Sequence, residues 1–175
     1  MKKIEILLDD YLIKKKDRED LVNLFSKVKN KKITECDTHA KGGLAWFPVD
    51  LVITAIGLTA TGFLQEMGKD IYLKLKKKIK KLTRSERGDW TVYVNIAFEI
   101  KNKIIYFTFS EAIIERDFDE AFDKIFSDFN ETAKKIEKFI NSNPENLFGY
   151  YESITMQYDF EEKRWIVGWL NKNKS

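Results

Sequence analysis

The chain has one cysteine and one histidine among its 175 residues, and this scarcity disfavours most metal and nucleophile chemistry. Because Cys36 has no partner for an internal disulfide, a reducing, cytoplasmic setting is predicted. Cys36 and His39 lie close together in sequence, but no CxxC or HxxxH pattern supplies the remaining ligands of a zinc site. Neighbours on one predicted strand also seldom form a Cys–His nucleophilic pair. No metal site is therefore predicted.

The motifs of common enzymes are missing as well, since the chain contains no GxxxxGK[ST], GxGxxG, GxSxG or HExxH pattern. An acidic cluster lies at the start of a predicted helix, where carboxylates complement the helix dipole without a bound cation. Its members are Glu111, Glu115, Asp117, Asp119, Glu120 and Asp123, without the central glycine of a calcium loop. No catalytic residue and no cofactor are predicted, and an enzyme of unknown class is the remaining alternative.

Proline and glycine are also scarce, and no stretch has the composition of a flexible linker. The 43% hydrophobic and 14% aromatic residues are typical of a globular protein. A single domain covering 1–175 is predicted, and its subdomains, if it has them, are 1–88 and 89–175. The N-terminal stretch 1–10 has too short an apolar run for a secretory signal, so none is expected.

The most informative segment joins an apolar run at 44–64, with one acidic residue, to a stretch at 69–82 that carries seven lysines. This pattern predicts one long helix near 48–82, with Gly68 as the best place for a break or bend. In its second half the apolar residues recur at helical spacing, at Ile71, Leu75, Ile79 and Leu82.

The apolar half of this predicted helix has three interpretations: a buried core helix, a membrane span or a surface attachment. Its uncharged part, 51–64, has only 14 residues, fewer than the ~20 that a bilayer needs. The lysines that follow favour the cytoplasmic side, which would send the basic N-terminal part across the bilayer. A helix buried against the protein's own sheet is therefore predicted, a transmembrane span is disfavoured, and contact with a membrane surface stays open.

Apolar spacing elsewhere predicts an α+β fold, with a largely antiparallel sheet packed against about three helices. The predicted sheet has two N-terminal strands, at 4–8 and 31–39. It also has two C-terminal β-hairpins, whose turns lie at about 101–103 and about 161–163. The predicted helices lie at 17–30, near 48–82 and at 117–141.

The net charge of +3 is unevenly distributed along the chain. Residues 1–43 carry +3, residues 44–88 carry +5 and residues 89–175 carry −5. The basic middle and the acidic end are therefore expected to attract each other, within one chain or between two copies.

Residues 49–82 resemble a segment found in small accessory proteins of bacterial conflict systems. There an apolar helix containing glycine passes into a G-x-D-x-Y-x-x-L-K stretch, and a β-hairpin follows. The matching residues here are Gly68, Asp70, Tyr72, Leu75 and Lys76. The resemblance implies an accessory or regulatory role beside an effector, and it carries no catalytic residue over to this chain.

These observations together predict a non-enzymatic interaction or regulatory module that docks on an acidic protein partner or on another copy. The predicted docking residues are the lysines of the basic helix, Lys74, Lys76, Lys77, Lys78, Lys80 and Lys81. A solvated helix face explains the same lysines without any partner. Binding to anionic lipid or nucleic acid is the other alternative, although lysines contact phosphates without recognising bases, and no nucleic-acid-binding motif accompanies them.

Overall fold

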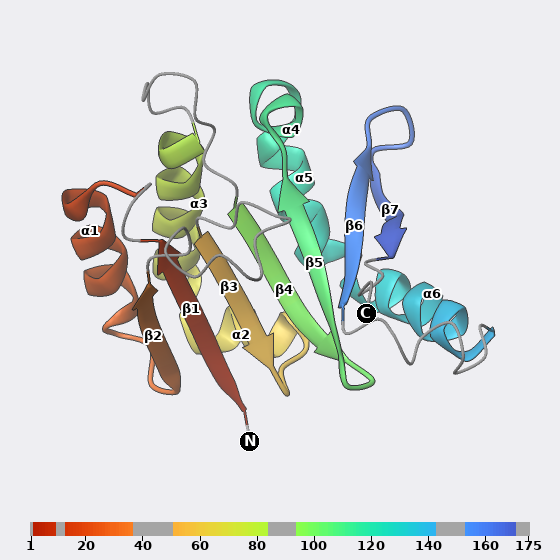
Figure 1. Cartoon of the computed structure of the whole chain (residues 1–175), viewed down its shortest axis with the longest axis horizontal. Coiled ribbons are helices and arrows are strands. Elements are labelled where there is room, and N and C mark those ends of the chain that lie inside the picture. Colours follow the sequence, from red (N-terminus) through yellow and green to blue (C-terminus); the bar gives the residue numbers. More distant parts are fainter. Residues whose placement is uncertain (1, 10–12, 37–50, 84–93, 143–152, 171–175) are drawn as a thin grey trace.

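The computed structural model describes residues 2–9, 13–36, 51–83, 94–142 and 153–170 (Figure 1). Its strands are β1 (Lys3–Asp9), β2 (Lys31–Cys36), β3 (Leu51–Ile56), β4 (Val94–Ile100), β5 (Lys103–Phe109), β6 (Ser153–Asp159) and β7 (Arg164–Leu170). The helices within these ranges are α1 (Lys15–Phe25), α2 (Ala60–Met67), α3 (Lys69–Thr83), α4 (Glu111–Arg116), α5 (Phe118–Ser127) and α6 (Phe129–Ser142). The α+β class is confirmed.

The strands form one mixed sheet in the order β2-β1-β3-β4-β5-β6-β7. The pairs β1/β2, β3/β4 and β5/β6 are parallel, and the pairs β1/β3, β4/β5 and β6/β7 are antiparallel. The prediction of a largely antiparallel sheet is therefore wrong. Helices lie between the two strands of every parallel pair along the chain, because parallel neighbours need a long crossover connection.

The helices cover one face of the sheet, behind the strands in Figure 1. A continuous row of buried apolar side chains crosses that face from one strand to the next. The row consists of Ile6, Ile53, Ile96, Phe107 and Met156, which are aligned by the strand register. The rings of α2, α5 and α6 pack against this layer, so aromatic burial supplies much of the apolar driving force.

The predicted long helix near 48–82 is wrong: the described part of this segment, residues 51–82, forms β3, α2 and α3 instead. β3 has buried residues on both faces, and such a strand has the uninterrupted apolar sequence of a buried helix. Gly57, with φ of 62°, follows the strand. Thr59 then caps α2, its hydroxyl accepting a hydrogen bond from the Gly62 N–H at 3.1 Å. The break predicted at Gly68 is confirmed, and its φ of 73° suits glycine.

The structure also has more helices than the three predicted, six within the described ranges. The predicted helix 117–141 is two helices, α5 and α6, which meet at Asp128, and α4 precedes them. Asp128 has φ of −101° and ψ of 6°, outside helical values, so the chain changes direction there. The apolar spacing of three and four continues through this break, which explains why the two helices resemble one in the sequence.

Both predicted hairpins are confirmed. β4 and β5 are joined by Lys101 and Asn102, whose φ values of 52° and 60° are those of a two-residue type I′ turn. β6 and β7 pair antiparallel, and Asp159 and Arg164 are the paired residues nearest to the turn. The Asp159 carboxylate accepts hydrogen bonds from the N–H groups of Glu161 and Glu162, which closes that turn.

The crossover from β5 to β6 has an uncommon hand, and this places α5 beside α3. The β3–β4 and β5–β6 crossovers both step toward the β7 edge, but β5 runs opposite to β3. Because both sets of helices cover the same face, the two crossovers have opposite hands (Figure 1). The β3–β4 crossover is the common right-handed form and the β5–β6 crossover is left-handed. With a right-handed crossover, α5 would lie on the other face of the sheet, away from the lysines of α3.

Candidate docking surface

The six lysines of α3 that were predicted to dock point in three directions, as expected at 3.6 residues per turn. Lys76 and Lys80, one turn apart, face α5. Lys78 faces α1. The remaining three, Lys74, Lys77 and Lys81, lie on an exposed stripe of the helix.

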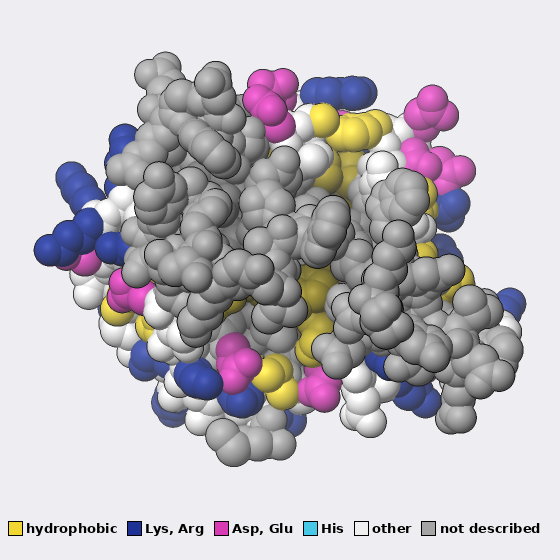
Figure 2. Space-filling view, viewed as in Figure 1, with side chains coloured by type: hydrophobic (Ala, Val, Ile, Leu, Met, Phe, Trp, Pro, Cys, Tyr) yellow, Lys and Arg dark blue, Asp and Glu magenta, His cyan; other side chains and the backbone are white. Residues whose placement is uncertain are grey.

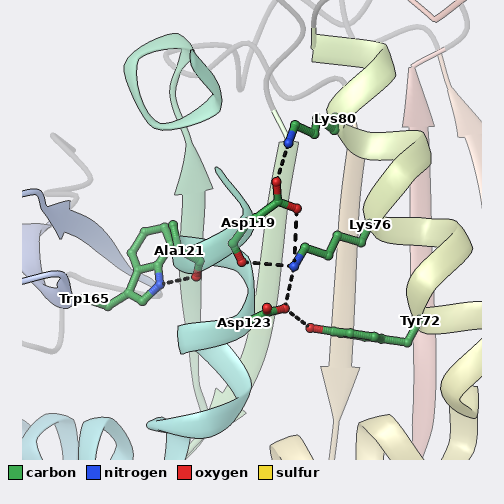
Figure 3. Close-up of polar contacts among 7 residues, drawn as sticks. All are labelled: Tyr72, Lys76, Lys80, Asp119, Ala121, Asp123 and Trp165. Atoms are coloured by element: carbon green, nitrogen blue, oxygen red, sulfur yellow. Dashed lines mark hydrogen bonds and ion pairs between the residues drawn. The ribbon is translucent and has the colours of Figure 1, made fainter. Parts of the chain in front are cut away.

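On the α5 side, Lys76 and Lys80 are held by the aspartates of α5 (Figure 3). The Lys76 ammonium donates to Asp123 Oδ1 at 2.8 Å and to the Asp119 backbone oxygen at 3.0 Å. Lys80 makes an ion pair with the Asp119 carboxylate, and its hydrogen bond holds the pKa of that carboxyl below its usual value. The side chain of Lys76 is only 13% exposed. These lysines therefore join α3 to α5.

Tyr72 completes this contact. Its hydroxyl donates to Asp123 Oδ1 at 2.6 Å, so one carboxylate oxygen receives both Tyr72 and Lys76 (Figure 3). Burial, together with the hydrogen bond to Asp123, raises the pKa of Tyr72 above its usual value, so the phenol stays a donor. The expected attraction between the basic middle and the acidic end of the chain thus occurs within one chain at these residues.

On the α1 side, Lys78 bridges two aspartates, with Nζ 2.7 Å from Asp17 Oδ1 and 2.6 Å from Asp20 Oδ2. Burial alone lowers the pKa of Lys78, but the hydrogen bonds to both carboxylates outweigh it and raise that pKa. The hydrogen bond from Lys78 lowers the pKa of Asp20. The side chains of Lys78 and Asp17 are only 13% and 16% exposed, so this pair is largely removed from water.

Of the six lysines predicted to dock, the structure therefore assigns three to internal ion pairs and leaves three exposed. Lys74, Lys77 and Lys81 make no ion pair with any residue that the structure describes. Lys81 lies close enough to Asp20 to lower its pKa slightly further, without a direct contact. Leu73 lies among these lysines on the same side of α3 and is 45% exposed.

A groove of about 840 Å³ lies between α1 and α3, beside the exposed stripe. The lining residues come from α1 and the turn after it, from the end of α2 and from α3. They are Asp20, Asn23, Leu24, Lys27, Met67, Gly68, Lys69, Asp70, Ile71, Lys74 and Lys78. Lys74 belongs to both the groove and the stripe, so the two form one continuous surface. Seen from the strand side, Lys and Arg side chains also gather at the edge of the molecule around α1 (Figure 2).

Sequence reasoning missed the contribution of Lys27 and Lys69 to this surface. Both are exposed, and neither makes an ion pair within the described part of the chain. Lys69 is next to the predicted set, but Lys27 lies just beyond the end of a different helix. Only the packing of α1 against α3 brings Lys27 to the groove, and no local sequence pattern reports that packing.

The other candidate sites of the sequence are the Cys36–His39 pair and the acidic cluster. No group of three or more His, Cys, Asp or Glu residues in the described ranges is arranged to hold a metal ion. Cys36 ends β2, whereas His39 lies outside the described residues. In the acidic cluster, Asp119 and Asp123 bind α3, and Glu120 pairs with Lys163 at 2.7 Å.

Comparisons with protein-family models, curated proteins and solved structures gave no match to this chain. The resemblance to accessory proteins of conflict systems therefore stays a prediction. Within the ranges that the structure describes, no helix combines the length and apolarity needed to cross a bilayer.

Proposed function

We propose that the protein is a non-enzymatic docking module that binds an acidic protein partner through α3. The observation that carries this proposal is the separation of the α3 lysines into two sets. Lys76, Lys78 and Lys80 neutralise aspartates of the same chain, whereas Lys74, Lys77 and Lys81 face outward without ion pairs in the described part. Ion pairs within the chain explain the first set. The second set has no such role among the described residues, and we propose that it binds an external partner.

The exposed lysines have the geometry of a short linear contact. Lys74 and Lys81 are seven residues apart on one helix face, so they span about 10 Å along its axis. Carboxylates one and two turns apart on a partner helix repeat over the same distance. The attraction also accelerates encounter and weakens as salt is added, because the surface charges are screened.

An acidic protein fits this surface better than a nucleic acid does. Base stacking on exposed aromatic rings contributes much of the affinity for single strands. Among the described residues the exposed large apolar side chains are Leu73 and Ile166, neither of which is aromatic. The ring of Tyr72, on α3 itself, packs against Phe122 and Phe126 at centroid distances of 5.4 and 5.3 Å. The stripe therefore offers charge without a stacking platform.

Reversing the three exposed lysines to glutamate is expected to abolish binding to acidic peptides while the fold is kept. The probe is a fluorescein-labelled glutamate–alanine peptide, and the measurement is fluorescence anisotropy at low salt and at about 0.15 M salt. Each exposed pair contributes roughly 0.2–1 kcal/mol, and reversal turns attraction into repulsion, so affinity should fall at least about tenfold.

The matched control reverses Lys29, Lys134 and Lys138, which are exposed, lie outside α3 and give the same change in net charge. This control variant should retain most of the affinity. If both triple variants lose affinity equally, only net charge matters and the proposal is wrong. Stronger binding of the wild-type protein to RNA or to phosphatidylserine vesicles than to the peptide would assign the surface to those anions instead.

A further inference from the structure

We infer that the docking segment of the acidic partner also carries an apolar side chain, which inserts into the groove between α1 and α3. This inference rests on the proposed function and narrows the partner to an acidic segment with an apolar anchor. The inference is motivated by the groove, whose floor is apolar. The lysines alone indicate only that the partner is acidic.

The floor of the groove is apolar, and the groove is large enough to hold an apolar side chain of a partner. Leu24 from α1 and Ile71 from α3 are half-buried, and Met67 at the end of α2 is 2% exposed. A volume of about 840 Å³ exceeds what one apolar side chain occupies and leaves room for the backbone on either side of it. Met67 is unbranched and adaptable, which suits a site that closes around a leucine or phenylalanine.

The rim of the groove is basic. Four of the lining residues are lysines and two are aspartates, and one of those aspartates, Asp20, is already bonded to Lys78. Lys27, Lys69 and Lys74 therefore face the groove opening together with Asp70, whose carboxylate makes no ion pair among the described residues. An occupant with carboxylates on both sides of an apolar residue matches this arrangement of charge and apolar surface.

The continuity of the groove with the exposed stripe extends the contact. Because Lys74 lines the groove, a segment anchored there can continue along α3 past Lys77 and Lys81. A polyphosphate backbone would use the lysines and leave the apolar floor exposed. The flat surface of a bilayer would meet the stripe without entering the space between two helices.

The test compares two labelled peptides of equal length and charge, each rich in glutamate, one with a central leucine and one with a central serine. Wild-type protein should bind the leucine peptide about ten- to a hundredfold more tightly, because burial of one leucine side chain has an effect of that size. Asn23→Trp places a bulky ring in the groove from the exposed side of α1. This variant should bind both peptides with the weaker affinity of the serine peptide.

The control variant is Gln65→Trp, which also replaces an exposed helical amide by tryptophan but lies outside the groove. It should discriminate between the peptides as the wild-type protein does. Equal affinity of the wild-type protein for both peptides would overturn the anchor and leave the proposed function standing. Failure of both peptides to bind would overturn the proposed function itself.

A second measurement on the wild-type protein avoids any effect of the Trp substitution on folding. With methyl-labelled leucine, isoleucine and methionine, NMR titration with the leucine peptide should shift the methyl signals of Leu24, Met67 and Ile71. The serine peptide should leave these signals unchanged while it shifts the amide signals of Lys74, Lys77 and Lys81. Methyl signals that do not respond to the leucine peptide would overturn the anchor.

Discussion

Phe98→Ala is expected to lower the free energy of unfolding by about 4 kcal/mol, which is large for a single substitution. Phe98 is fully buried on β4, where the rings of three helices and a neighbouring strand meet. Its centroid lies 4.5 Å from that of Phe129, 5.8 Å from Phe63, 6.1 Å from Phe107 and 6.2 Å from Phe126. Because these rings belong to separate elements, they cannot all move in to fill the cavity that alanine leaves.

Urea unfolding monitored by circular dichroism measures this loss as a lower midpoint with an unchanged slope. Leu73→Ala is the control, since Leu73 is 45% exposed and its truncation should change stability by less than about 0.5 kcal/mol. A loss of stability for Phe98→Ala no larger than that of the control would show that the helices do not pack their rings on β4.

Lys78→Met is expected to destabilise the protein by about 2 kcal/mol, while Lys77→Met is nearly neutral. Removal of Lys78 leaves Asp17, whose side chain is only 16% exposed, without its ion pair. We expect a smaller loss of stability than for a fully buried ion pair, because Asp20, the second partner of Lys78, is 51% exposed and can be hydrated again. Lys77 is adjacent in sequence and exposed, so the same substitution there removes no internal ion pair among the described residues.

Thermal unfolding of the two methionine variants at neutral pH tests this difference directly. A combined Lys78→Met and Asp17→Asn variant should recover part of the stability, because the uncompensated carboxylate is then gone. Equal melting temperatures for Lys77→Met and Lys78→Met would mean that the run of lysines is a uniformly solvated face, without the ion pairs between α1 and α3.

The two hairpins could be predicted from the sequence, because apolar residues alternate along β4–β5 and along β6. The strand β3 could not. Its residues are buried on both faces between β1 and β4, so Leu51, Val52 and Ile53 form an unbroken apolar run. Such a run fits a buried helix equally well, and only its neighbours in the sheet decide between the two structures.

The sequence could not separate the exposed lysines of the predicted docking set from those that form internal ion pairs. Helical spacing separates the apolar stripe of α3 from its lysines, but it does not tell which lysines meet another part of the chain. Lys76 and Lys80 are four residues apart, and so are their partners Asp119 and Asp123. The equal spacing allows two ion pairs only if α5 lies beside α3. That placement depends on a left-handed crossover, which general rules make improbable.

The central claim is that α3 carries two sets of lysines, one that stabilises the fold and one that binds an acidic partner. The most direct test replaces lysines by glutamine in two variants. One variant changes the exposed set, Lys74, Lys77 and Lys81, and the other changes the two internal lysines that do not line the groove, Lys76 and Lys80. Unfolding free energy and affinity for the leucine-containing acidic peptide are then measured for both. The first variant should lose affinity at unchanged stability, and the second should lose at least about 2 kcal/mol of stability yet bind wherever it is folded. Loss of stability in the first variant, or loss of affinity confined to the second, would contradict the account.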